Sequence, residues 1–306
     1  MATVNGLHHV TAISGDARGN LAFYRDVLGL RFIKKTVNFD DPSVYHLYYG
    51  DELGRPGTAM TFFPFEGTAR GRRGVGETSE TAFAVPEGSL DGWGERLAVH
   101  GIDAEDDARF GERRLVFTDP EGVGLALTEA VDDPRRGWAG GELGATAAVK
   151  GFHGVTLSLM SLDGTAAVLT DGLGYVLTGR SDGIVRFASQ SGAARHVDVV
   201  VSDQAAARSG AGSVHHVAFS VPDAATQAEV ARQVVRLGMQ VTSVIDRDYF
   251  AAIYFRTPGG VLFEVSTDGP GFTVDEPAER LGSELKLPKQ HEHLRARLER
   301  SLPTLA

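Results

Sequence analysis

Three short stretches of the sequence carry the residues that could do chemistry. They read GLHHVTAI at 6–13, SVHHVAFSV at 213–221 and PGGVLFEVS at 258–266. Each is typical of a strand, whose side chains alternate between two faces. Only one histidine of each pair can therefore share a face with its second neighbour, which places His9 beside Thr11. In the later pair, His216 lies opposite the apolar face that Val217 and Phe219 make.

The third stretch contributes a carboxylate. Glu264 lies between Phe263 and Val265 in an apolar run. A carboxylate inside a strand is costly to bury unless another group pairs with it. Two histidines and one carboxylate, each on a strand, are the ligands of a facial metal triad that leaves coordination positions open. We therefore predict that His9, His216 and Glu264 bind one divalent metal ion.

The composition limits the class of protein and of partner. The chain has 306 residues, of which 42% are hydrophobic, as expected for a soluble globular protein with two domains. A net charge of −10 and a pI near 5.5 argue against nucleic acid and anionic membranes as partners. No apolar run is long enough to span a membrane, and we expect no secretory signal. The absence of cysteine excludes thiolate metal sites and favours a cytoplasmic location.

The chain repeats itself. AFAVPE at 82–87 matches AFSVPD at 218–223, and GLHHVT at 6–11 matches GFHGVT at 151–156. These matches predict four units, near 5–65, 78–130, 150–202 and 212–268. Within each unit the pattern indicates a strand, a helix and about three further strands, so the predicted fold class is α+β.

The predicted helices and boundaries follow from apolar spacing and turn residues. Asn20–Leu28 and Ala224–Leu237 are amphipathic, and each is followed by a glycine. The Gly- and Pro-containing stretch 131–150 is the expected linker between the halves. We expect an N-terminal pair of units over 1–135, a C-terminal pair over 150–275 and a tail over 276–306 with a helix at 288–302.

Longer motifs carry a resemblance to a known family. They are LHHVT at 7–11, YHLYYGDELGRPGTAMTFFP at 45–64, HHVAFSVPD at 215–223, YFRTPGGVLFEV at 254–265 and LGSELKLP at 281–288. With these motifs the chain resembles the vicinal oxygen chelate superfamily, and within it the ring-cleaving dioxygenases that act on hydroquinones. The resemblance covers nearly the whole chain. It implies four βαβββ modules paired into two domains of cupped mixed β-sheet.

The resemblance also implies roles for individual residues. The metal ligands correspond to His9, His216 and Glu264, the same three that the strand alternation selects. The residues that match the family's other functional positions are His8, Thr11, His215, Arg247 and Tyr254. Alternation alone places His8 and His215 on the face opposite the metal, so their role requires a bulge or a twist in the strand.

The implied chemistry is oxidative. Fe(II), with Mn(II) as the alternative, would bind at the triad, and the partners would be a small aromatic diol and O₂. In the other two units Glu80, Ala126 and Gly154 stand where ligands would be, which predicts one metal site per chain. The oligomeric state stays open, with a homo-oligomer allowed.

Three alternatives share this fold. A catechol extradiol dioxygenase has the same triad but takes its ligands from the C-terminal half alone, whereas His9 belongs to the first unit. A glyoxalase-type isomerase has a fourth protein ligand, and Ala126 and Gly154 disfavour it. A binding protein of the antibiotic-sequestering kind needs no metal. We interpret His46, His100 and His196 as structural.

Overall fold

Four copies of one module build the chain. The computed structural model describes residues 1–305. The first module comprises β1 (Leu7–Ser14), α1 (Ala17–Leu21) with a π-helical turn (Ala22–Val27), β2 (Arg31–Val37), β3 (Tyr45–Gly50) and β4 (Ala59–Pro64). The second comprises β5 (Glu77–Val85), α2 (Leu90–Val99), β6 (Ala104–Arg109), β7 (Glu112–Thr118) and β8 (Gly124–Glu129).

The second half of the chain repeats this order. The third module comprises β9 (Gly151–Leu159), α3 (Asp163–Ala167) with a π-helical turn (Val168–Gly172), β10 (Val176–Ser181), β11 (Ile184–Ala188) and β12 (His196–Val201). The fourth comprises β13 (Ser213–Val221), α4 (Ala224–Arg236), β14 (Ile245–Asp246), β15 (Phe250–Arg256) and β16 (Leu262–Pro270). The predicted α+β fold of four βαβββ modules is therefore confirmed.

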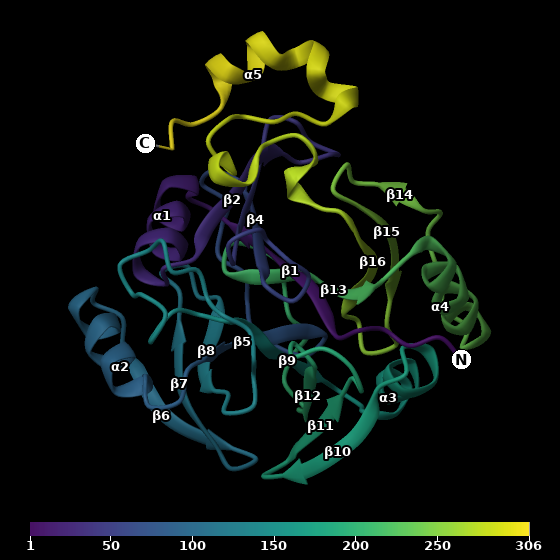
Figure 1. Cartoon of the computed structure of the whole chain (residues 1–306). Helices are drawn as coiled ribbons and strands as arrows, with labels where there is room; N and C mark the ends of the chain where they lie inside the picture. The colour runs from purple at the N-terminus through teal and green to yellow at the C-terminus, as the bar shows by residue number, and fades with distance from the viewer. Residues whose placement is uncertain (306) are drawn as a thin grey trace.

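The modules pair across the two halves of the chain. One eight-stranded sheet has the order β14-β15-β16-β13-β1-β4-β3-β2, and the other has the order β10-β11-β12-β9-β5-β8-β7-β6. The first module thus joins the fourth and the second joins the third, as the neighbouring β1 and β13 in Figure 1 illustrate. The expected pairing within 1–135 and within 150–275 is wrong in this respect. The first strand of every module offers an equivalent free edge, and the repeat does not say which edges meet.

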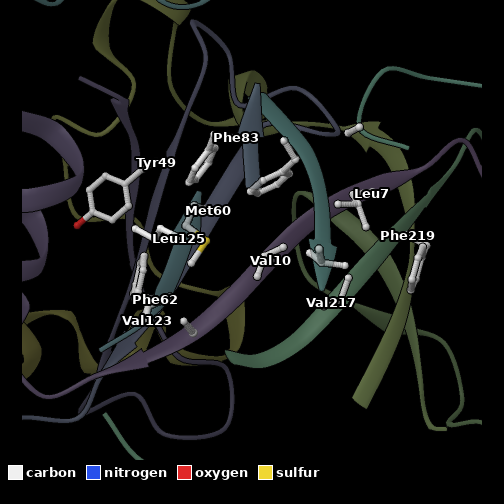
Figure 2. Packing of buried hydrophobic residues seen from close by; sticks show 14 of the residues in the cluster. Leu7, Val10, Tyr49, Met60, Phe62, Phe83, Val123, Leu125, Val217 and Phe219 are labelled. Atoms are coloured by element: carbon white, nitrogen blue, oxygen red, sulfur yellow. The ribbon is translucent and has the colours of Figure 1, made fainter. Parts of the chain in front are cut away.

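One hydrophobic core lies between the two sheets. Figure 2 shows Val10, Met60 and Val217 of the first sheet packed close to Phe83 and Leu125 of the second. All of these side chains are fully buried. The apolar faces of β1, β13 and β4 are therefore used to join the sheets, and the opposite face of the first sheet is left for polar groups.

The helices agree with the sequence within a few residues. The segment expected at 20–28 is helical over 17–27, and α4 covers 224–236 against the expected 224–237. The tail helix divides into a 3₁₀ segment (Lys289–Leu294) and α5 (Arg295–Ser301), preceded by short 3₁₀ turns at Phe272–Val274 and Ala278–Arg280. No helix in residues 1–305 combines the length and the apolar character needed to cross a membrane.

Both histidine pairs lie at β-bulges. Where β1 pairs with β13, the register shifts between Leu7 and His9, so His8 has no partner residue. A second shift brings Thr11 opposite His216 and Ala12 opposite Val214, which leaves His215 without a partner. A bulge interrupts strict alternation and turns two successive side chains toward one face. The bulge that the sequence required for His8 and His215 is therefore present in both strands.

Candidate metal centre

Three buried side chains meet on the polar face of the first sheet. His9 extends from β1, His216 from β13 and Glu264 from β16. The Nε2 atoms of His9 and His216 lie 3.4 Å and 3.0 Å from Oε2 of Glu264, and 3.3 Å from each other. Glu264 is fully buried, and both histidines are at least 96% buried. The structure therefore brings the three predicted ligands together.

The triad has the geometry and the donor set of a metal site. Neighbouring ligands of an octahedral ion at about 2.1–2.3 Å lie roughly 3.0–3.3 Å apart, close to the separations between these three atoms. Oε2 of Glu264 has no well-directed hydrogen bond within residues 1–305, although Oε1 accepts one from Ser266 Oγ at 2.5 Å. A buried carboxylate oxygen without a donor is costly unless a cation binds it. The residues present fit a divalent metal ion.

The bulged histidines orient the ligands. Nδ1 of His9 lies 2.9 Å from Nδ1 of His8, and Nδ1 of His216 lies 2.8 Å from Nδ1 of His215. A histidine that binds metal through Nε2 carries its proton on Nδ1, so each ligand donates to the residue before it. His8 and His215 must accept these bonds, and each then carries its own proton on Nε2.

Burial keeps the supporting histidines neutral. It lowers the pKa of His8 to about 3, and His9 adds to this effect. It lowers the pKa of His215 to about 4, with His216 adding to it. Burial opposes ionisation of Glu264, but His9 and His216 outweigh it and hold the pKa of the carboxyl well below its usual range. Neutral supporting histidines thus lie behind an ionised carboxylate, which is the protonation state in which a carboxylate binds a metal.

Arg247 and Tyr254 lie beside the triad. Arg247 Nε donates to the Tyr254 hydroxyl at 3.1 Å, and the Tyr254 ring meets the His216 ring edge-on with centroids 5.8 Å apart. Burial and the Glu264 carboxylate raise the pKa of Tyr254 above its ordinary value. Burial opposes the charge of Arg247, but Tyr254 and Glu264 reverse this and raise its pKa. Both groups therefore keep their protons and act as donors.

A cavity of about 300 Å³ opens on the triad. Its lining comprises His9, Asn38, Phe39, Asp40, Asp41, His46, Tyr48, Phe63, Phe65, His215, His216, Arg247, Phe250, Tyr254, Leu262 and Glu264. Six of the predicted site residues are in this set. The other two, His8 and Thr11, are buried and do not line the cavity; His8 contacts the cavity-lining His9, and Thr11 contacts Thr61.

Sequence reasoning missed part of the wall. The sequence predicts a structural role for His46, yet His46 and Tyr48 of β3 both line the cavity. They share one face of the strand because they are two residues apart. The first module therefore contributes part of the cavity wall in addition to the candidate ligand His9. The alternation of YHLYYG was the available signal, although every residue of this strand is buried and no polar face stands out.

Comparisons with known proteins agree with this architecture. The family model described as "Glyoxalase/Bleomycin resistance protein/Dioxygenase superfamily" matches residues 6–127 and 151–265. The chain belongs to this superfamily. It is 42% identical to MhqE of Bacillus subtilis, named "Putative ring-cleaving dioxygenase", over 98% of this chain and 99% of the relative. It is 37% identical to the chlorohydroquinone/hydroquinone 1,2-dioxygenase of Sphingobium indicum, over 98% and 96%.

Solved structures give the same fold. A crystal structure of a "putative dioxygenase" from Bacillus subtilis is 40% identical, with a TM-score of 0.97 over 100% of this chain and 99% of that one. Glyoxalase I from Zea mays is 15% identical, with a TM-score of 0.65 over 86% and 92%. At that identity the likeness to glyoxalase I concerns the fold alone.

In the second sheet, ion pairs occupy the position equivalent to the triad. Glu80 stands where His216 stands in the first sheet, and it accepts hydrogen bonds from Arg109 and Arg114. Another ligand-like group, Glu112, His153 and His196, lies on the same sheet. Arg186 Nη1 donates to Glu112 Oε2 at 2.6 Å. Guanidinium groups therefore already neutralise these carboxylates, and we assign no metal to this sheet.

Proposed function

We propose that this protein is an Fe(II)-dependent dioxygenase that cleaves the ring of hydroquinone-type aromatic diols. The observation that carries the proposal is the triad of His9, His216 and Glu264 at the wall of an aromatic-lined cavity of about 300 Å³. Relatives that are 37–42% identical over nearly their full length and are named as ring-cleaving or hydroquinone dioxygenases support it.

The protein ligands leave room for both reactants. His9, His216 and Glu264 would hold Fe(II), and the bound ion would supply the redox chemistry that joins an aromatic diol to O₂. The cavity is suited to one aromatic ring, because Phe39, Phe63, Phe65 and Phe250 line it. Holding a ring and O₂ in one small space replaces a bimolecular encounter by an intramolecular one.

The chain's own groups around the triad are hydrogen-bond donors. Tyr254 keeps its phenolic proton, Arg247 is charged, and His215 carries its remaining proton on Nε2. Donors in a buried cavity favour an oxygen that is deprotonated or becomes negative during the reaction. We infer that these three groups bind the reacting oxygens and lower the cost of deprotonating the diol.

The choice of a para diol has a physical consequence. A catechol can chelate a metal through both oxygens, whereas a hydroquinone offers it only one. Recognition of the second hydroxyl must then come from protein groups beyond the triad. The cavity has such groups in Asn38, His46, Tyr48 and Asp40, none of which is a metal ligand.

The test is oxygen consumption by protein loaded with Fe(II) under anaerobic conditions. Hydroquinone, methylhydroquinone, chlorohydroquinone and catechol are compared, alongside isomerisation of a hemithioacetal and protein loaded with Mn(II). We expect oxygen uptake with at least one hydroquinone, faster than with catechol, and none with Glu264→Ala. Faster turnover of catechol than of every hydroquinone would move the substrate class to catechols. Isomerase activity without oxygen uptake would overturn the proposal.

A further inference from the structure

A chain of hydrogen bonds crosses the polar face of the first sheet. Thr11 Oγ1 lies 2.8 Å from Thr61 Oγ1, Thr61 Oγ1 lies 2.9 Å from His46 Nε2, and His46 Nδ1 lies 2.8 Å from the Tyr48 hydroxyl. These hydrogen bonds follow the strand register, because Thr11 of β1 pairs with Thr61 of β4 and Thr61 pairs with Tyr48 of β3. Thr11 is also the cross-strand partner of His216.

The series of hydrogen bonds from Thr11 to Tyr48 reaches the cavity at one end. Thr11 and Thr61 are fully buried away from it, whereas His46 and Tyr48 line it. Burial lowers the pKa of His46 well below its ordinary value, so its ring is neutral and has one donor and one acceptor nitrogen. The imidazole therefore donates a hydrogen bond to one of its two neighbours, Thr61 and Tyr48, and accepts one from the other. When Tyr48 donates to His46, its oxygen remains free to accept a hydrogen bond from a ligand.

Tyr48 lies beyond the triad, on the side away from Tyr254. The sheet order places β15, which carries Tyr254, next to β16, and places β3 two strands from β1 on the opposite side. Neighbouring strands are about 4.8 Å apart, so β3 is roughly 10 Å from the strand of His9. A ring that reaches the triad through one oxygen and lies along this face extends toward β3.

We propose that Tyr48 forms a hydrogen bond with the far hydroxyl of a para diol whose first oxygen lies at the triad, and that His46, Thr61 and Thr11 position it. This inference rests on the proposed function and identifies the residue that recognises the second hydroxyl of a para diol. The matching ligands are aromatic rings with two oxygens at opposite ends. A catechol has both oxygens at the triad and has no second hydroxyl that reaches Tyr48. Thr61 and Thr11 lie outside the cavity lining and act as positioning residues, and His46 connects them to Tyr48.

Binding without turnover tests the inference. Protein loaded with Fe(II) is titrated under anaerobic conditions with hydroquinone and with 4-methylphenol, in which a methyl group replaces the far hydroxyl. We expect Tyr48→Phe to weaken hydroquinone about three- to tenfold, as the loss of one neutral hydrogen bond does, and to leave 4-methylphenol within twofold. Thr61→Val should reproduce part of this loss without altering the cavity wall, and Thr61→Ser should restore binding.

The matched control is the next residue of the same strand. Tyr49 is fully buried like Tyr48, and its hydroxyl donates to Asn20 Oδ1 at 2.9 Å on the face away from the cavity. Tyr49→Phe removes a comparable hydrogen bond and should leave the ratio of the two affinities unchanged. A purely structural effect of Tyr48→Phe would weaken both ligands together.

The outcomes separate this inference from the proposed function. The inference is overturned if wild-type protein does not prefer hydroquinone to 4-methylphenol, or if Tyr48→Phe leaves that preference intact. Oxygen uptake by the same samples reports on the proposed function. Preferential hydroquinone binding that depends on Tyr48, without oxygen uptake, would support recognition of the far hydroxyl by Tyr48. The same result would contradict the proposed dioxygenase activity.

Discussion

Replacement of His8 should weaken metal binding, although His8 does not line the cavity. It contacts His9 at Nδ1 and not at Nε2, the atom that would bind the metal. His8→Phe removes the acceptor that lies 2.9 Å from Nδ1 of His9 and leaves that buried N–H without a partner. A ring is retained against Phe250, whose centroid is 5.1 Å away, so packing changes little. Loss of such a supporting hydrogen bond lowers metal affinity by about 10–100-fold. That corresponds to about 1.4–2.7 kcal/mol.

The assay is competition between the protein and a chelator for Mn(II), which avoids oxidation during the titration. The matched control is His153→Phe, because His153 holds the position of His8 in the second sheet, next to Gly154. We expect the dissociation constant to rise only for His8→Phe. An affinity within twofold of wild type, or an equal loss in His153→Phe, would refute the orienting role of the histidine at the bulge.

Three further predictions concern the site and the stability of the fold. Arg247→Ala and Tyr254→Phe should keep the metal and nearly the same Tm while turnover falls roughly ten- to a thousandfold, measured by metal analysis beside oxygen uptake; loss of metal would instead make them structural. Metal at about one hundred times its dissociation constant should add about 2.7 kcal/mol to the free energy of unfolding. For a chain of this length that raises Tm by about 4 °C, and a rise that persists in Glu264→Ala would place the metal elsewhere. Burial lowers the pKa of His196 to about 3, so between about pH 6.5 and pH 3 only the unfolded chain gains this proton and stability falls as pH falls. His196→Gln should reduce the stability loss between about pH 7 and pH 4.5 by about 2–3 kcal/mol in urea unfolding, and an unchanged loss would contradict this.

The proximity of the three candidate ligands could be predicted because the repeat and the alternation are independent patterns that agree. His9 and His216 occupy matching positions of the first and fourth modules, and Glu264 is the one carboxylate in the apolar run VLFEV at 261–265. A histidine alone in a strand would not have identified the site. The structure adds the distances, and Oε2 of Glu264, which accepts no well-directed hydrogen bond within residues 1–305, gives a physical reason for a cation.

The positions of His8 and His215 could not be derived from alternation, because each lies at a bulge. The sequence carries a trace of this. Leu7 and Val10 both pack in the core although they are three residues apart, and a strict period of two excludes that. An apolar residue on each side of an adjacent polar pair therefore indicates a bulge in such strands.

The pairing of modules and the second wall of the cavity depend on long-range contacts. The repeat identifies equivalent strand edges, but only packing decides that β1 meets β13 and β5 meets β9. His46 lies in a strand that is buried on both faces, so its sequence has no polar side that marks the cavity. Both the pairing of the modules and the cavity wall on β3 depend on contacts between modules, and a local sequence pattern carries no information about those contacts.

The most direct test of the central claim is the fate of labelled oxygen. Protein loaded with Fe(II) is supplied with hydroquinone and ¹⁸O₂, and the product is analysed by mass spectrometry. A ring-cleaving dioxygenase acting at the triad of His9, His216 and Glu264 should give a ring-opened product that contains both ¹⁸O atoms, and Glu264→Ala should give none. A product without label, or with the ring intact, would contradict the account.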